Sequence, residues 1–141
     1  MSRGSSEGAV LRDRPEAERG AAAVELAIIL PVILLIVVGI LEFGREYSRY
    51  QVLQGAAREG ARLAAVRADP DTVIARVYEA SDPYAPSASP SVSTSSGASQ
   101  CDVLTKGEAV TVSWTQEFKI NIAFWGSATL SRPIKGVFRC E

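Results

Sequence analysis

The residue types that most often carry out chemistry are scarce in this sequence. It contains no His, and Cys101 and Cys140 are its only cysteines, so a zinc site of the usual Cys/His kind would have too few ligands. No GxSxG, HExxH or glycine-rich phosphate loop occurs, and general acid-base catalysis would depend on scattered carboxylates such as Glu108 and Glu117. We therefore expect a protein that is not an enzyme and that holds no metal or cofactor.

The two cysteines are better suited to a disulfide. They lie far apart in the sequence, and no His or further Cys is present to share a metal with them. A disulfide persists only in an oxidising compartment. Closing a loop of about 40 residues would stabilise the fold by roughly 4 kcal/mol on the chain-entropy model. The alternative is that Cys101 and Cys140 are reduced residues of the core.

One carboxylate interrupts a long apolar run. Glu25 is the only charged residue between Ala21 and Leu41. At 1.5 Å per residue, residues 21–41 would form roughly 31 Å of helix, about one hydrocarbon core thickness. The Leu, Ile and Val residues contribute roughly −4 to −8 kcal/mol of insertion free energy, against at most about +3 kcal/mol for a central carboxylate. We therefore expect residues 21–41 to form a transmembrane helix.

The residues before this run are polar, and residues 1–20 are interpreted as a leader. The net charge of the whole chain is −1. That value gives no electrostatic reason to expect a nucleic-acid partner, because counterion release requires clustered Lys and Arg. Arginines precede the span and also follow it closely, so the positive-inside rule favours a cytoplasmic N-terminus only slightly.

Helical periodicity continues beyond the span. Apolar and small residues at three- and four-residue steps form one stripe, with charged residues largely off it: Phe43, Tyr47, Tyr50, Leu53, Ala57, Ala61 and Ala64. Either the downstream part of the chain covers this stripe or neighbouring subunits pack on it. Asp69 is a good N-cap and Pro70 suits the first helical position. Residues 42–80 are thus predicted to form an amphipathic extension and a short second helix.

The periodicity changes in the C-terminal half. Residues 81–100 are rich in Ser, Pro and Ala and are predicted to form a loop. Between residues 110 and 124, seven apolar residues share one parity, which is typical of a half-buried strand: Val110, Val112, Trp114, Phe118, Ile120, Ile122 and Phe124. Six polar residues take the other parity: Thr111, Ser113, Thr115, Glu117, Lys119 and Asn121.

Turn signals on either side of this strand complete a small sheet. Lys106-Gly107 would connect it to a short strand at residues 102–105, and Gly126-Ser127 would lead into a strand over residues 128–140. The sequence therefore predicts an α+β fold, in which a long N-terminal helix and a short second helix precede a three-stranded antiparallel sheet. This sheet, residues 101–141, would be tied by the disulfide and packed on the helix.

The segment at the start of the apolar run resembles a known processing signal. Residues 19–25, Arg-Gly-Ala-Ala-Ala-Val-Glu, resemble the class III prepilin cleavage signal of type IV pilin-like proteins. The resemblance implies that a membrane aspartyl peptidase cuts after Gly20, so that Ala21 becomes the new N-terminus and Glu25 the fifth mature residue. Ala21 and Glu25 stand at i and i+4, so the new ammonium and the carboxylate can meet on one helix face. The resemblance also implies that Glu25 pairs with the amine of a neighbouring subunit in an assembled pilus.

A longer stretch, residues 20–66, resembles the TadE-like family, the minor pilins or pseudopilins of tight-adherence (Flp) pilus systems. It combines Gly20, Glu25, the mid-helix Pro31 and the distal pattern Ala-x-x-Gly-Ala-Arg of residues 57–62. Major Flp pilins usually carry an aromatic residue after the glutamate, whereas Leu26 follows it here. They are also far shorter than this chain. Both differences favour a minor subunit.

By this resemblance, the protein is a structural minor pilin or pseudopilin of a system that serves cell adhesion. It would cross the inner (cytoplasmic) membrane once, with its leader cytoplasmic and its C-terminal domain outside, and would stay there or enter a surface pilus. Its implied partners are the prepilin peptidase, other pilin and pseudopilin subunits, the membrane pilus-assembly platform and the lipid bilayer. The alternative is a signal-anchored extracytoplasmic protein-binding module that is not incorporated into a pilus, and dependence on the peptidase would discriminate the two.

Overall fold

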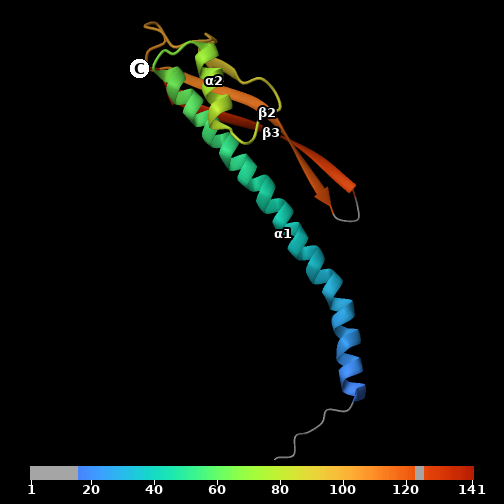
Figure 1. Cartoon of the computed structure of the whole chain (residues 1–141). Coiled ribbons are helices and arrows are strands. Elements are labelled where there is room, and N and C mark those ends of the chain that lie inside the picture. Colours follow the sequence, from blue (N-terminus) through green and yellow to red (C-terminus); the bar gives the residue numbers. More distant parts are fainter. Residues whose placement is uncertain (1–15, 123–125) are drawn as a thin grey trace, which may run out of the picture. The chain divides into compact units, whose positions relative to one another are not determined.

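The computed structural model describes residues 16–122 and 126–141, which form two helices followed by three strands (Figure 1). The elements are α1 (Glu16–Ala65), α2 (Pro70–Ala80), β1 (Ser91–Thr94), β2 (Ala109–Ile122) and β3 (Gly126–Arg139). Most of the predicted leader, residues 1–15, and the predicted strand residue Phe124 lie outside the described residues. The predicted α+β class, with a long helix, a short helix and a three-stranded antiparallel sheet, is confirmed.

The chain divides into two compact units, Met1–Val37 and Val38–Glu141. The first unit contains the N-terminal part of α1, which stays helical through Pro31. A proline inside a membrane helix removes one backbone hydrogen bond, and such helices tolerate that loss. The second unit contains the rest of α1, all of α2 and the sheet, and it holds the hydrophobic core.

The short second helix has the predicted boundaries. Asp69 caps it, since the backbone amide of Thr72 donates to Asp69 Oδ1 at 3.0 Å, and Pro70 occupies the first helical position. Val73 and Val77 are fully buried. The helix therefore presents one apolar face to the core, as its four-residue spacing requires.

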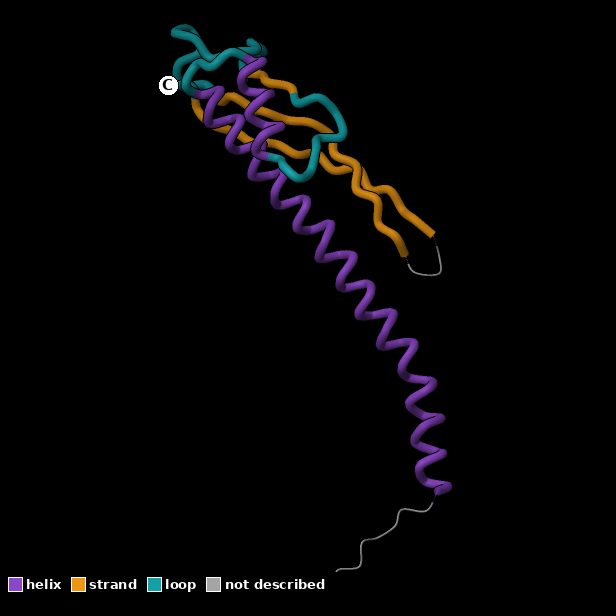
Figure 2. Tube along the Cα trace, in the orientation of Figure 1, coloured by secondary structure: helices purple, strands orange, loops and turns teal. Residues whose placement is uncertain are grey.

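The sheet is antiparallel throughout, in the order β1-β2-β3 (Figure 2). In the long β2–β3 hairpin Trp114 lies opposite Ile134, and Phe118 lies opposite Leu130. The predicted period of two is confirmed for the described part of β2, because four apolar residues of one parity are buried and the other parity is exposed or half-buried: Val110, Val112, Trp114 and Phe118.

The prediction of a first strand at residues 102–105 is wrong. These residues form a turn, in which Asp102 Oδ1 accepts hydrogen bonds from the backbone amides of Leu104 and Thr105. A side chain that binds its own backbone in this way removes the donors that a strand would need. The first strand is β1 instead, within the segment predicted as a loop, where Val92 pairs with Val112 of β2.

The apolar stripe of α1 is covered by the chain itself from Leu53 onwards. Leu53, Ala57, Ala61 and Ala64 are buried, and they belong to one cluster with residues of α2 and of the sheet. The first of the two interpretations of the stripe therefore holds for this half. The earlier residues of the stripe are not covered: Phe43 is 67% exposed and Tyr47 is 53% exposed.

Candidate functional site

The apolar start of α1 has no buried face. Every residue from Gly20 to Leu41 is exposed, including the large side chains of Leu26 and Ile28. An amphipathic helix of a soluble domain would bury one stripe, whereas this segment is hydrophobic all round. Among the described residues, α1 is the one helix that is long and apolar enough to cross a membrane. Such a surface requires lipid or other apolar helices around it.

The residues of the predicted processing signal all lie on helical backbone. α1 begins at Glu16, so Gly20 and Ala21 lie inside the helix and not at its start. Within the part of the chain that the structure describes, a Cβ built on Gly20 would meet no atom within 4 Å. A peptidase that binds extended backbone would have to unwind this turn. Gly20 makes unwinding easier, because glycine is about 1 kcal/mol less favourable than alanine in a helix.

Glu25 is exposed on the same helix, one turn after Ala21. Residues four apart on a helix lie on one face, about 6 Å apart along the axis. The geometry of α1 thus puts the predicted new N-terminus and the carboxylate side by side. A carboxylate on a lipid-facing helix is expensive unless an opposite charge reaches it.

The predicted disulfide between Cys101 and Cys140 is present. Both residues are buried, and their Cα atoms are 5.6 Å apart. The backbone amide of Cys140 donates to Glu108 O at 2.8 Å, and that of Glu141 donates to Ala65 O at 3.1 Å. The bond therefore ties the segment before β2 to the end of β3, and the backbone hydrogen bond of Glu141 holds this point against the end of α1.

The distal pattern of small residues in α1 is a packing surface. Ala57 and Ala61 are buried, and a Cβ on Gly60 would overlap Val77 of α2. The Glu59 carboxylate forms ion pairs with Arg62 at 3.4 Å and with Arg76 of α2 at 3.3 Å. Hydrogen bonds from these two guanidinium groups hold the pKa of Glu59 below its ordinary value. The pattern thus brings α2 and the sheet close to α1.

Gln116 was missed by the sequence reasoning. It has the parity of Trp114 and Phe118 and is completely buried. Its Oε1 accepts hydrogen bonds from Trp114 Nε1 at 3.0 Å and from the backbone amide of Ser87 at 2.9 Å, so it fixes the segment before β1 on β2. The available signal was a polar residue at an otherwise apolar parity, which needs buried partners.

Comparison with known proteins bears on most of α1. The family model described as TadE-like protein matches residues 20–62. The match begins at Gly20 and ends at Arg62, the last residue of the distal pattern, and it confirms the resemblance expected from the sequence. No curated protein and no solved structure was found to match the chain.

Proposed function

Because residues 20–62 match the TadE-like family model, we propose that this chain is a structural, non-catalytic minor pilin or pseudopilin of a tight-adherence pilus system. A prepilin peptidase cuts it after Gly20. The observation that carries the proposal is the combination found at the start of α1. An apolar helix that is exposed on all sides carries Glu25, its single charged residue between positions 21 and 41, one turn after the proposed new terminus.

The proposed role of Glu25 follows from its surroundings. In lipid, an ionised carboxylate carries a high desolvation cost. Cleavage after Gly20 creates an ammonium group at Ala21, and a neighbouring subunit brings a second one. Pairing across subunits would offset the desolvation of both charges and would fix the register between two helices.

The rest of the chain suits display outside the membrane. The Cys101–Cys140 bond is of a kind that persists in oxidising compartments. This supports a cytoplasmic leader, a single membrane crossing and an extracytoplasmic sheet. The partners would be the prepilin peptidase, other pilin and pseudopilin subunits, the membrane assembly platform and the bilayer itself.

Glu25→Ala tests the assembly step separately from processing. The variant should still be cut and should insert at least as readily as the wild type, because a carboxylate is removed from lipid. Association with the other pilus subunits should fall, since leaving a buried partner charge uncompensated costs about 3–5 kcal/mol. The measurement is co-purification of the processed protein with those subunits at matched membrane levels.

Two variants control this experiment. Val24→Ala shortens the exposed neighbouring side chain without changing charge and should assemble normally, and Glu25→Asp keeps the carboxylate and should retain part of the association. Equal recovery of Glu25→Ala and wild type would argue against assembly through Glu25. It would favour an anchored extracytoplasmic binding module that never enters a pilus.

A further inference from the structure

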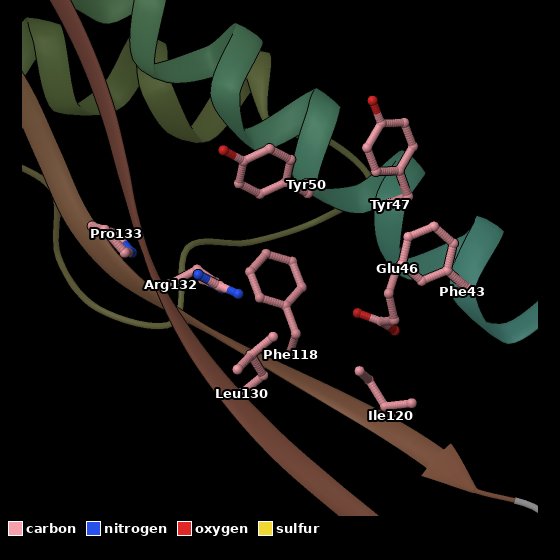
Figure 3. A pocket seen from close by; sticks show the side chains of 9 residues that line it. All are labelled: Phe43, Glu46, Tyr47, Tyr50, Phe118, Ile120, Leu130, Arg132 and Pro133. Atoms are coloured by element: carbon pink, nitrogen blue, oxygen red, sulfur yellow. The ribbon is translucent and has the colours of Figure 1, made fainter.

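A groove of about 370 Å³ lies between α1 and the β2–β3 hairpin (Figure 3). Its apolar walls come from three elements: Phe43, Tyr47 and Tyr50 of α1, Phe118 and Ile120 of β2, and Leu130 of β3. The whole groove belongs to the second compact unit. Neither the disulfide nor the proposed cleavage signal takes part in it.

The two ends of the groove differ. At the inner end, the ring of Tyr50 turns towards Phe118, with ring centroids 6.1 Å apart, and Phe118 is buried in the core. At the outer end, Phe43 and Tyr47 stack with centroids also 6.1 Å apart, yet they remain 67% and 53% exposed. Leu130, on the opposite wall, is 42% exposed. The protein thus leaves the outer end apolar and open.

This outer end is continuous with the exposed apolar surface of α1. The last residues of the apolar run, Ile40 and Leu41, are exposed and lie in the same compact unit. At 1.5 Å per residue, Phe43 lies about 3 Å and Tyr47 about 9 Å beyond Leu41 along the helix. The headgroup layer on each side of a bilayer is roughly 5–8 Å thick. If α1 spans the membrane over residues 21–41, the Phe43 ring lies in that layer, where aromatic residues are enriched, and Tyr47 lies at its outer edge.

The groove also carries both signs of charge. Glu46 and Arg132 line it, and Figure 3 shows the Glu46 carboxylate directed from α1 towards the strands. Arg49 Nη1 is 3.7 Å from Glu46 Oε2. Within the described residues, however, neither Glu46 Oε2 nor Arg49 Nε has a hydrogen-bond partner, although both atoms are buried. Glu46 and Arg132 thus place one carboxylate and one guanidinium along the groove, which suits an occupant with an ammonium and a phosphate group.

We propose that the groove holds part of a phospholipid from the bilayer around α1. The headgroup lies beside Glu46 and Arg132, and the first acyl carbons lie against Phe43, Ile120 and Leu130. The volume is at the low end of the range of about 300–1,000 Å³ seen for ligand pockets, so a segment of one lipid fits and a whole lipid does not. The hairpin is thereby docked on the membrane surface. This inference rests on the membrane span alone and is independent of the pilus role.

Quenching by brominated lipid tests the proposal on the full chain. The protein is reconstituted in phosphatidylcholine vesicles with or without bromine on shallow acyl carbons. The background variant Trp125→Phe leaves Trp114, which is 6% exposed and lies in the core. Leu130→Trp then places a reporter in the groove, and Leu104→Trp places a control at a 91% exposed position by the turn before β2. Ile120→Trp reports from the opposite wall in case Leu130→Trp disturbs the fold.

Brominated lipid should abolish most of the emission added by Leu130→Trp and by Ile120→Trp, and it should leave that of Leu104→Trp largely intact. Quenching at the two groove positions that is no stronger than at position 104 would overturn the proposal. Quenching that develops only when the protein is diluted in lipid would also overturn the proposal. It would mean that a second copy of the chain fills the groove at higher protein density. The vesicles contain no peptidase or pilus subunits, so either result is separate from a failure of the pilin assignment.

Discussion

Gly136 of β3 lies directly against the backbone of Ala57 in α1. A Cβ built on Gly136 would overlap the carbonyl group of Ala57, and backbone atoms, unlike the end of a flexible side chain, cannot swing aside. Gly136 pairs with Val112 in the hairpin, and both Ala57 and Val112 are completely buried. This contact lets the sheet approach the helix closely enough to close the core.

Gly136→Ala should therefore destabilise the second unit by about 1–3 kcal/mol or more, the usual range for overpacking a well-filled core. The matched control is Gly55→Ala on the exposed side of α1, where a Cβ meets no atom within 4 Å. The control should gain up to about 1 kcal/mol from helix propensity. Thermal unfolding of the full chain in detergent, followed by near-ultraviolet circular dichroism, measures both changes. Equal midpoints for Gly136→Ala and wild type would show that the helix and sheet are not in backbone contact.

The stability of this unit should fall in acid. Hydrogen bonds from Arg62 and Arg76 lower the pKa of Glu59, those from Thr72 lower the pKa of Asp69, and the backbone amide of Thr105 lowers the pKa of Asp102. The unfolded chain binds these protons more readily, so the stabilisation is complete above the unfolded pKa values of about 4. It is lost as pH falls through the lower pKa values of the folded state.

Chemical denaturation between pH 7 and pH 2 tests whether stability falls in acid. The midpoint should stay level down to about pH 5 and then decline. Asp69→Asn retains a capping side chain but removes one of the titrating groups, so its decline should be shallower. A midpoint that rises on acidification would contradict the assignment of these three carboxylates.

Local patterns predicted most of the fold. The N-cap at Asp69, the start of α2 at Pro70 and the alternation along β2 depend on neighbouring residues, and all three are confirmed. Strand β1 was not predicted, because its four residues lie in a Ser- and Pro-rich stretch without a periodic signal. They form a strand because they pair with β2. The apolar groove was not predicted either, because its α1 wall and its hairpin wall come from residues about 70 positions or more apart in the sequence.

In the candidate site, too, local features were predicted from the sequence and long-range ones were not. Sequence spacing predicted that Ala21 and Glu25 would share a helix face, and α1 runs through both positions. The start of α1 at Glu16, before Gly20, was not predicted, because helix ends are the least certain part of any pattern. The disulfide could be predicted by counting ligands, whereas its position beside Ala65 depends on how β3 returns to α1.

The disulfide should protect both thiols in protein taken from its native membrane. Thiol labelling after unfolding without reductant should give no modification, and reduction should expose two labelled sites. Cys101→Ser is the positive control, since it leaves the Cys140 thiol free for labelling. Reduction should lower stability by roughly 4 kcal/mol on the chain-entropy model. Two free thiols in the unreduced protein would contradict both the bond and the proposed extracytoplasmic side.

Gly20→Val should block processing without disturbing the fold. Among the described residues, a Cβ at this position meets no atom within 4 Å, so we expect the effect to arise at the peptidase, which has to fit the backbone around the cut. The variant should accumulate as a form that retains residues 1–20. Gly44→Val, in the same helix and equally free of neighbours, should be processed normally. Unchanged size of the Gly20→Val protein would refute the prepilin interpretation.

N-terminal sequencing of the mature protein from its native membrane tests the central claim most directly. Cleavage after Gly20 predicts a single sequence beginning at Ala21, with Glu25 as its fifth residue and the apolar part of α1 retained. A sequence beginning at Met1 would show that no prepilin peptidase acts on the chain. A sequence beginning beyond Leu41 would show that the apolar segment is removed as a conventional signal peptide, and either result would contradict the assignment as a pilin-like subunit.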